Sequence, residues 1–304
     1  MITFPQLRLF IRLSRPLFLL GGVLLYALGA AIANFLGRPF HPALYLVGQV
    51  LVTLLQLMTH YLNEYYDSDA DQENTSRTWL TGGSGAIGPE SLPKSVAIYA
   101  AVLTLALAAT ISTAALITGA FPLLVWPVLL LGFLGAFFYS TPPLRLVSTG
   151  YGELAAALVV AGLTPTLAYV LQTGELHRLL LMSTTPLVAL SFAMIIVFEL
   201  PDYATDLKHG KQTLMVRLGL SAAMRAHDIA IVFALISFAI AFSLGLPSRV
   251  SLSALIVLPL AAAQMWQLNR IRKGYPTKWT SLTFSALGLF VIAAYLQLAG
   301  YLLT

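Results

Sequence analysis

Long apolar stretches separated by shorter polar connections follow one another along the whole chain. Nine of them approach the roughly 20 residues that a helix needs to cross the hydrocarbon core of a membrane. They cover residues 17–36, 43–62, 95–118, 122–139, 152–172, 180–200, 224–246, 250–268 and 279–303. No connection is long enough for a separate soluble domain. The pattern therefore predicts an all-α integral membrane protein, with nine transmembrane helices in a single domain over residues 1–304.

Composition supports a membrane location. Hydrophobic residues make up 58% of the 304 residues and charged residues only 10%, whereas soluble domains carry about 25% charged residues. The chain contains no cysteine, which excludes disulfides, thiolate metal sites and cysteine nucleophiles. No small-residue cleavage site follows the first apolar stretch, so we expect that stretch to stay as a helix rather than to be removed as a signal peptide.

Basic residues gather on one side of the predicted membrane domain. Most of the 17 lie before the first stretch or in even-numbered connections: Arg8, Arg12, Arg15, Arg77, Lys94, Arg145, Lys208, Lys211, Arg217, Arg225, Arg270, Arg272, Lys273 and Lys278. The positive-inside rule then places the N-terminus and these connections in the cytoplasm, and nine spans place the C-terminus on the opposite side of the cell membrane. We interpret the net charge of +5 as topology and contact with lipid head groups, not as binding of nucleic acid.

A first group of polar side chains follows the second apolar stretch. Asn63, Asp67 and Asp71 are spaced four residues apart, so they share one face if the helix continues, whereas Asp69 points elsewhere. Carboxylates stacked in this way repel one another unless a cation lies between them. The alternative is a solvated acidic loop.

A second group repeats that spacing at the end of the sixth stretch. Asp202 and Asp206 are again four residues apart, and Glu199 lies three residues before Asp202 as Glu64 lies three residues before Asp67. Ionisable residues near a membrane are costly and commonly functional. Hard oxygen ligands favour Mg²⁺, which shares its coordination shell with substrate phosphates. The two groups together therefore predict a Mg²⁺ site for a phosphorylated substrate.

Basic side chains on the same side could bind that substrate. Arg77 follows the first acidic group, Lys211 follows the second, and Arg145 lies in the fourth connection. Arginine and lysine bind phosphate oxygens, although charges that only set topology would look the same. The sequence Gly82-Gly83-Ser84-Gly85 could cover a phosphate with backbone N–H groups, or form a flexible turn.

With these residues placed, the chain resembles the UbiA-type membrane prenyltransferases over essentially its whole length. Asn63-Glu-Tyr-Tyr-Asp67-x-x-x-Asp71 is similar to the first Asp-rich motif of that family, Asp202-x-x-x-Asp206 to the second, and Arg15-Pro16 to its opening.

Other segments resemble the branch that includes 1,4-dihydroxy-2-naphthoate prenyltransferases of menaquinone synthesis. They are Tyr139-x-x-Pro142-Pro143, Gly150-x-Gly152-Glu153 and the run from Gly210 to Gly219. Two positions depart from the family pattern: Glu64 replaces the usual Asp, and residues 198–201 replace the Asn-Asn-x-Arg that is common in this branch. The second departure leaves the aromatic acceptor open.

The resemblance implies a helical bundle around a central cavity that transfers a polyprenyl group from its diphosphate to an aromatic acceptor, first of all 1,4-dihydroxy-2-naphthoate. The implied Mg²⁺ ligands are Asn63, Asp67, Asp71, Asp202 and Asp206, and the four aspartates together with Tyr139 are the implied catalytic residues. Arg15, Arg77, Arg145 and Lys211 are the implied diphosphate-binding residues.

Tyr139 would stabilise an allylic cation. The expected partners are the polyprenyl diphosphate, the acceptor and the lipid bilayer, without nucleic acid or an obligate protein partner. Two alternatives remain: the same chemistry on hydroxybenzoate, homogentisate, a chlorophyllide or glycerol phosphate, and an ion-coupled transporter, which would place its acidic residues near the middle of the membrane.

Overall fold

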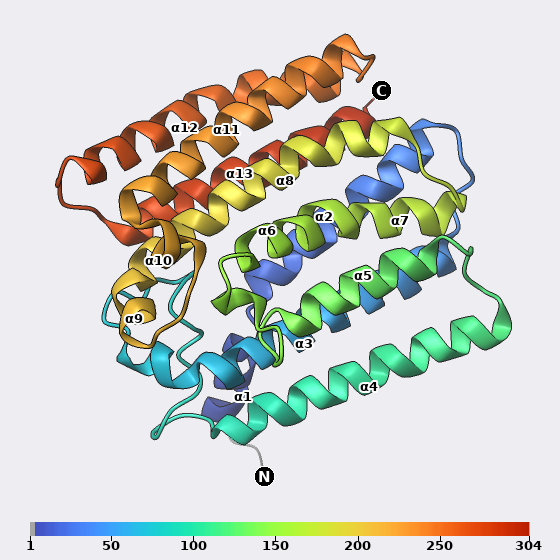
Figure 1. Ribbon diagram of the computed structural model, residues 1–304. Coiled ribbons are helices and arrows are strands. Elements are labelled where there is room, and N and C mark those ends of the chain that lie inside the picture. Colours follow the sequence, from blue (N-terminus) through green and yellow to red (C-terminus); the bar gives the residue numbers. More distant parts are fainter. Residues whose placement is uncertain (1–3, 304) are drawn as a thin grey trace.

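A computed structural model describes residues 4–303, which form a bundle of long helices lying side by side (Figure 1). No strand occurs among these residues. The longer helices are α1 (Phe4–Leu13), α2 (Pro16–Phe35), α3 (Pro42–Glu73), α4 (Lys94–Thr118), α5 (Val125–Phe138), α7 (Thr164–Thr173), α8 (Arg178–Glu199), α11 (Leu220–Ser243), α12 (Ser248–Arg272) and α13 (Trp279–Leu302). The short ones are η1 (Leu146–Ser148), α6 (Gly152–Ala157), η2 (Leu158–Leu163), η3 (Leu200–Asp202), α9 (Tyr203–Lys208) and α10 (Leu214–Leu218).

Within the described chain, eight helical segments are long and apolar enough to cross a membrane. They are α2, α3, α4, the continuous run from α6 through α7, the run from α8 through α9, α11, α12 and α13. The predicted all-α membrane class is therefore confirmed, but the predicted count of nine spans is not. The fourth apolar stretch forms α5, which has 14 residues and is about 21 Å long at 1.5 Å per residue. The two ends of the predicted domain, residues 1 and 304, lie outside the described residues.

Small residues allow the central helices to pack closely. Gly29 of α2 faces the backbone carbonyl of Pro165 at the start of α7, so a side chain at position 29 would overlap it. Gly48 of α3 similarly leaves room for the Tyr26 hydroxyl. Close backbone approach at small residues is the usual basis of helix packing in membranes, where lipid and core are equally apolar. Large apolar side chains such as Leu123 and Ile117 lie exposed on the outside of the bundle.

The helices carrying the acidic groups end together. α3 continues unbroken through Asp67 and Asp71 to Glu73, well beyond its apolar stretch. Asp202 and Asp206 follow α8, in η3 and α9. α9 contacts α3, and α9 and the C-terminal end of α3 lie at the left of the bundle in Figure 1. Helix assembly therefore brings both acidic groups to one end of the molecule.

The run from α6 to α7 is interrupted in its middle. Residues 158–163 form the π-helical turn η2, directly before Pro165. Proline has no N–H to continue the α-helical hydrogen bonds, which favours a local irregularity. π-Helical turns often occur at functional sites, and this one borders the cavity described below.

Candidate active site

The predicted acidic face of α3 is present. The Asn63 side-chain N–H donates to Asp67 Oδ2 at 2.8 Å, and Asp67 is only 6% exposed. Asp71 lies one turn further along the same helix and is partly buried. The Asp69 side chain is 81% exposed and lies 3.6 Å from Lys94 Nζ. Helical geometry therefore separates Asp69 from the predicted ligands.

Lys211 joins the two acidic groups. Its Nζ lies 2.9 Å from Asp67 Oδ2 and 3.7 Å from Asp206 Oδ1. Burial opposes its charge, but the carboxylates of Asp67 and Asp206 outweigh burial and hold the pKa of Lys211 above its ordinary value. Arg145 Nη2 lies 3.7 Å from Asp67 Oδ1, and its guanidinium lies over the Tyr66 ring. Two of the four predicted diphosphate-binding residues thus contact the acidic groups directly.

Asp202 binds the glycine-rich loop. Its carboxylate accepts hydrogen bonds from the Asn74 side chain at 2.6 Å and from the Gly82 backbone N–H at 3.2 Å. Arg77 donates from Nε to the Gly82 carbonyl at 2.6 Å and from Nη2 to the Asp71 carbonyl. Gly83 lies so close to the Asp71 carboxylate that a side chain at position 83 would overlap it. The loop therefore lies against the acidic groups, and Arg77 holds the loop in place.

Arg15 forms a buried ion pair with Glu64. Glu64 also accepts hydrogen bonds from the Ser84 backbone N–H at 2.6 Å and the Ser84 hydroxyl at 2.8 Å. Burial opposes the charge of Arg15, but the negative charge of Glu64 outweighs it and raises the pKa of Arg15. The sequence showed Glu64 as part of a repeated spacing and as a departure from a motif, but gave it no role. In the structure it connects the start of α2, α3 and the glycine-rich loop.

Two arginines at this site have an unusual backbone. Arg15 has φ 49° and Arg145 has φ 41°, and the other residues with positive φ in the described chain are all glycines. L-residues adopt this left-handed conformation at a cost, and such strain is concentrated at functional sites. The strain therefore supports both positions as parts of the site.

Tyr139 lies between the charged side chains around Asp67 and Lys211, here called the polar cluster, and an apolar cavity. Burial, followed by the charges of Glu199 and Glu153, raises the pKa of its hydroxyl. Glu153 is 1% exposed and accepts a hydrogen bond from the Leu214 backbone N–H at 2.6 Å. Sequence reasoning assigned neither glutamate a function, although both lie in segments that it singled out.

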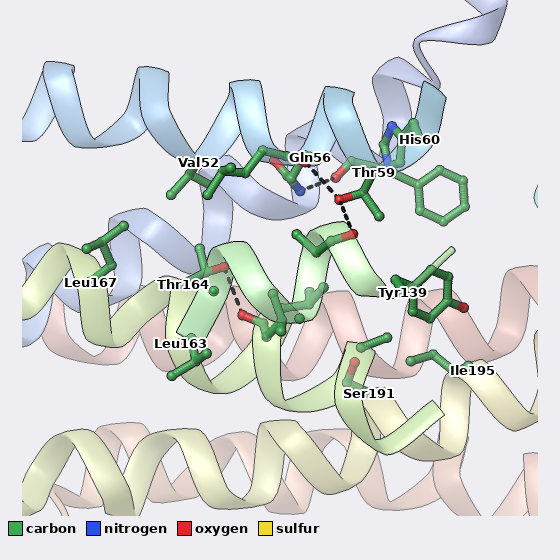
Figure 2. A pocket seen from close by; sticks show the side chains of 18 of the residues that line it. Val52, Gln56, Thr59, His60, Tyr139, Leu163, Thr164, Leu167, Ser191 and Ile195 are labelled. Atoms are coloured by element: carbon green, nitrogen blue, oxygen red, sulfur yellow. Dashed lines mark hydrogen bonds between the residues drawn. The ribbon is translucent and has the colours of Figure 1, made fainter. Parts of the chain in front are cut away.

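An apolar cavity of about 260 Å³ extends away from the polar cluster. Figure 2 shows Tyr139 and His60 at one end, and Val52 and Leu167 at the other. The aromatic end also contains Phe18, whose ring lies edge-on to His60 at 6.1 Å and to Phe198 at 6.2 Å between centroids. A charged group would fit on the side of these rings that faces the polar cluster, and an apolar chain would fit on the side that faces the cavity.

The donor set suits Mg²⁺. Among residues 4–303 no three carboxylate or imidazole groups already converge as a metal site, and the Lys211 ammonium lies between Asp67 and Asp206. Every predicted ligand is an oxygen donor, as Mg²⁺ requires. A cation already occupies part of the space between the two acidic groups, so the electrostatics there favour positive charge.

Comparisons with known proteins agree with this geometry. Two curated relatives are named 1,4-dihydroxy-2-naphthoate octaprenyltransferase. The one from Bacillus subtilis (strain 168) is 22% identical over 76% of this chain and 70% of its own, and the one from Escherichia coli (strain K12) is 24% identical over 78% and 77%.

Solved structures share the fold. A UbiA homolog from Archaeoglobus fulgidus bound to GPP and Mg²⁺ superposes with a TM-score of 0.66 at 16% identity, covering 95% of this chain and 99% of that one. A UbiA homolog from Aeropyrum pernix K1 gives 0.65 at 15% identity, covering 92% and 97%. A digeranylgeranylglyceryl phosphate synthase gives 0.64 at 13% identity, covering 98% and 99%. The sequence profile described as the UbiA prenyltransferase family matches residues 22–291, so this membrane chain belongs to that family.

Proposed function

We propose that this protein transfers a polyprenyl group from its diphosphate to an aromatic acceptor, with 1,4-dihydroxy-2-naphthoate as the first candidate, and releases diphosphate. The observation that carries the proposal is that the polar cluster lies next to one end of the apolar cavity, where Tyr139 borders both. Lys211 and Arg145 lie beside Asp67, while the depth of the cavity is lined by apolar residues such as Leu163 and Leu167. A polyprenyl diphosphate has the same two parts, a charged head and an apolar tail.

The residues of the polar cluster would bind the diphosphate. Lys211 and Arg145 would neutralise charge that grows on the leaving group, an effect that is large in a site shielded from water. Mg²⁺, when bound, would supply further positive charge to the diphosphate oxygens. The residues that would hold it are Asn63, Asp67, Asp71, Asp202 and Asp206.

The aromatic end of the cavity would receive the allylic cation left when the C–O bond breaks. The ring of Tyr139, together with Phe18 and Phe198, offers π-faces that attract positive charge. The apolar lining would keep water away from this cation, so that it reacts with the acceptor ring rather than being hydrolysed.

The names of the relatives favour a naphthoate acceptor. Both curated relatives have 1,4-dihydroxy-2-naphthoate in their names, at 22% and 24% identity. The digeranylgeranylglyceryl phosphate synthase supports a glycerol phosphate acceptor only through its fold. The transporter alternative is disfavoured because the acidic groups lie at helix ends, and because the interrupted turn η2 contains no ionisable residue. We also infer that the acidic end is cytoplasmic and that the whole chain forms one membrane domain.

The test uses purified protein in lipid nanodiscs with polyprenyl diphosphates of several lengths and a panel of acceptors. Diphosphate release and product mass identify the reaction. We expect Asp67→Ala and Asp202→Ala each to abolish transfer while the protein remains folded, and chelation of Mg²⁺ to do the same reversibly. No diphosphate release with any acceptor would refute the proposed function, and full turnover in excess chelator would refute the metal site.

A further inference from the structure

A buried glutamate, Glu153, and a partly buried one, Glu199, lie together beside the proposed site. Glu153 lies in the first turn of α6 and Glu199 ends α8. These two helices pack against each other, which brings the two carboxyl groups close enough to interact. Glu153 Oε2 and Glu199 Oε2 are both shielded from solvent, and neither has a hydrogen-bond donor among residues 4–303. Glu153 is 1% exposed.

Such a pair requires a proton between the two carboxyl groups. Two carboxylates in contact repel each other, and burial in a poorly solvated site disfavours each charge further. A single shared proton removes one charge and makes a hydrogen bond between the oxygens. The charges that act on the pair include the Lys211 ammonium and the Asp206 carboxylate, and the Tyr139 hydroxyl lies near both glutamates. None of them donates a hydrogen bond to the Oε2 atom of either glutamate.

The pair lies one helical turn beyond the cavity wall. Ala156 and Ile195 line the cavity, and each shares a helix face with one glutamate: Glu153 is three residues before Ala156, and Glu199 is four residues after Ile195. Tyr139 also lines the cavity, at the end where Figure 2 places its ring. The two glutamates therefore lie one helical turn from lining residues of the cavity, at the end of the cavity that Tyr139 borders.

We propose that Glu153 and Glu199 form the proton acceptor of the transfer reaction, an inference that rests on the proposed function. The molecule that receives the prenyl group is then an aromatic ring that carries a hydroxyl group. The C–O bond to diphosphate breaks first, and diphosphate keeps that electron pair. A ring carbon of the aromatic substrate then forms the new C–C bond with the allylic cation. The hydroxyl proton passes to the pair, and the electrons of the O–H bond become a ring carbonyl.

The proton balance suits a buried site. Before the step the pair holds one proton and one negative charge. Afterwards it holds two protons and no charge, which is the state that burial favours. Lys211 does not compete for the proton, because its ammonium is paired with Asp67 and Asp206.

Glutamine variants test the pair without removing its contact. In Glu153→Gln one amide oxygen can still accept from the Leu214 N–H, while the amide N–H₂ donates to Glu199. We expect Glu153→Gln and Glu199→Gln to fold normally and to lose about 10²- to 10⁴-fold in transfer rate, the usual contribution of a positioned base. The control is Glu175→Gln, at an exposed ion pair with Arg38, which should retain the wild-type rate.

Three measurements distinguish a proton acceptor from a pair that only stabilises helix packing and from a cation-binding site. The rate loss should be smaller with an acceptor analogue whose electron-withdrawing substituents make its hydroxyl more acidic. Slow release of diphosphate from prenyl diphosphate without acceptor should be unchanged. The Mg²⁺ concentration for half-maximal rate should also be unchanged.

Wild-type rates in both variants would overturn the inference while leaving the proposed function intact, whereas failure of the wild type to form product would overturn the proposed function itself. A raised Mg²⁺ requirement would mean that the pair holds a cation. An equal loss with every acceptor analogue, with lowered thermal stability, would mean that the pair only holds α6 against α8. If Glu153→Gln fails to fold, Glu199→Gln decides, because the Glu199 side chain makes no capping hydrogen bond.

Discussion

Substitutions of Arg145 can separate the effect of its strained backbone from the effect of its guanidinium. Its backbone is left-handed, with φ 41° and ψ 57°, and its guanidinium lies 3.7 Å from Asp67. Glycine adopts this conformation freely, whereas alanine does not. Arg145→Gly and Arg145→Ala both remove the guanidinium, but only the glycine variant also removes the strain.

The expected difference in stability follows from two opposing effects. A left-handed conformation costs an L-residue about 1–2 kcal/mol, which the glycine variant recovers. Glycine has more conformational freedom than alanine in the unfolded chain, which lowers the stability of the glycine variant by about 0.4–1 kcal/mol. The loss of the Asp67 contact is common to both variants and cancels. Arg145→Gly should therefore be more stable than Arg145→Ala by about 1 kcal/mol, or roughly 2 °C in unfolding temperature for a chain of this size.

Thermal unfolding in one detergent, run in parallel with diphosphate release, measures both properties. We expect the two variants to lose activity equally, because the missing guanidinium no longer acts on the diphosphate. The control is Gly274→Ala, which lies between α12 and α13 at φ 82° with no atom near its added side chain. It should lose about 1 kcal/mol for the same reason and keep its activity. An Arg145→Gly protein that is less stable than Arg145→Ala, or clearly more active, would refute this reasoning.

Three further expectations follow from the same geometry. Asp69→Asn should keep most activity and Mg²⁺ dependence, because its carboxylate points outward, whereas Asp71→Asn should lose most of both; equal damage in a transfer assay would contradict a single ligand face. Glu64→Gln should lower thermal stability by about 3–5 kcal/mol, because it leaves the Arg15 charge buried without its partner, and an unfolding curve like that of the wild type would show that the pair is dispensable. A cysteine added after Thr304 should react with membrane-impermeant reagents only from the non-cytoplasmic side, and labelling from the cytoplasm would invert the proposed topology.

Much of the architecture is readable from the chain. A backbone in hydrocarbon must satisfy its own hydrogen bonds, so an apolar stretch of sufficient length becomes a helix, and eight of the nine predicted stretches do so at membrane-crossing length. The fourth stretch was counted as a span, but the turn after Pro122 delays α5 until Val125. Apolar content predicts that a segment is buried in lipid or protein, but not how much of it is helical.

The candidate site divides in the same way. The face formed by Asn63, Asp67 and Asp71, and the outward direction of Asp69, follow from helical periodicity alone, because neighbours four residues apart share a face in any helix. The same spacing predicted Asp202 and Asp206 as a pair. These are local properties, so the sequence by itself determined them.

Tertiary structure decided which of these groups meet and what each one binds. Lys211 contacts Asp67 across 144 positions of sequence, and Asp202 binds Gly82 across 120. Arg77 binds the backbone carbonyl of Gly82 in its own loop and that of Asp71 in α3. Glu153 and Glu199 meet only because α6 packs against α8. Periodicity records the faces of each helix but not which face turns toward which neighbour. That choice depends on the packing of the whole bundle, including close approaches such as the one between Gly29 and Pro165.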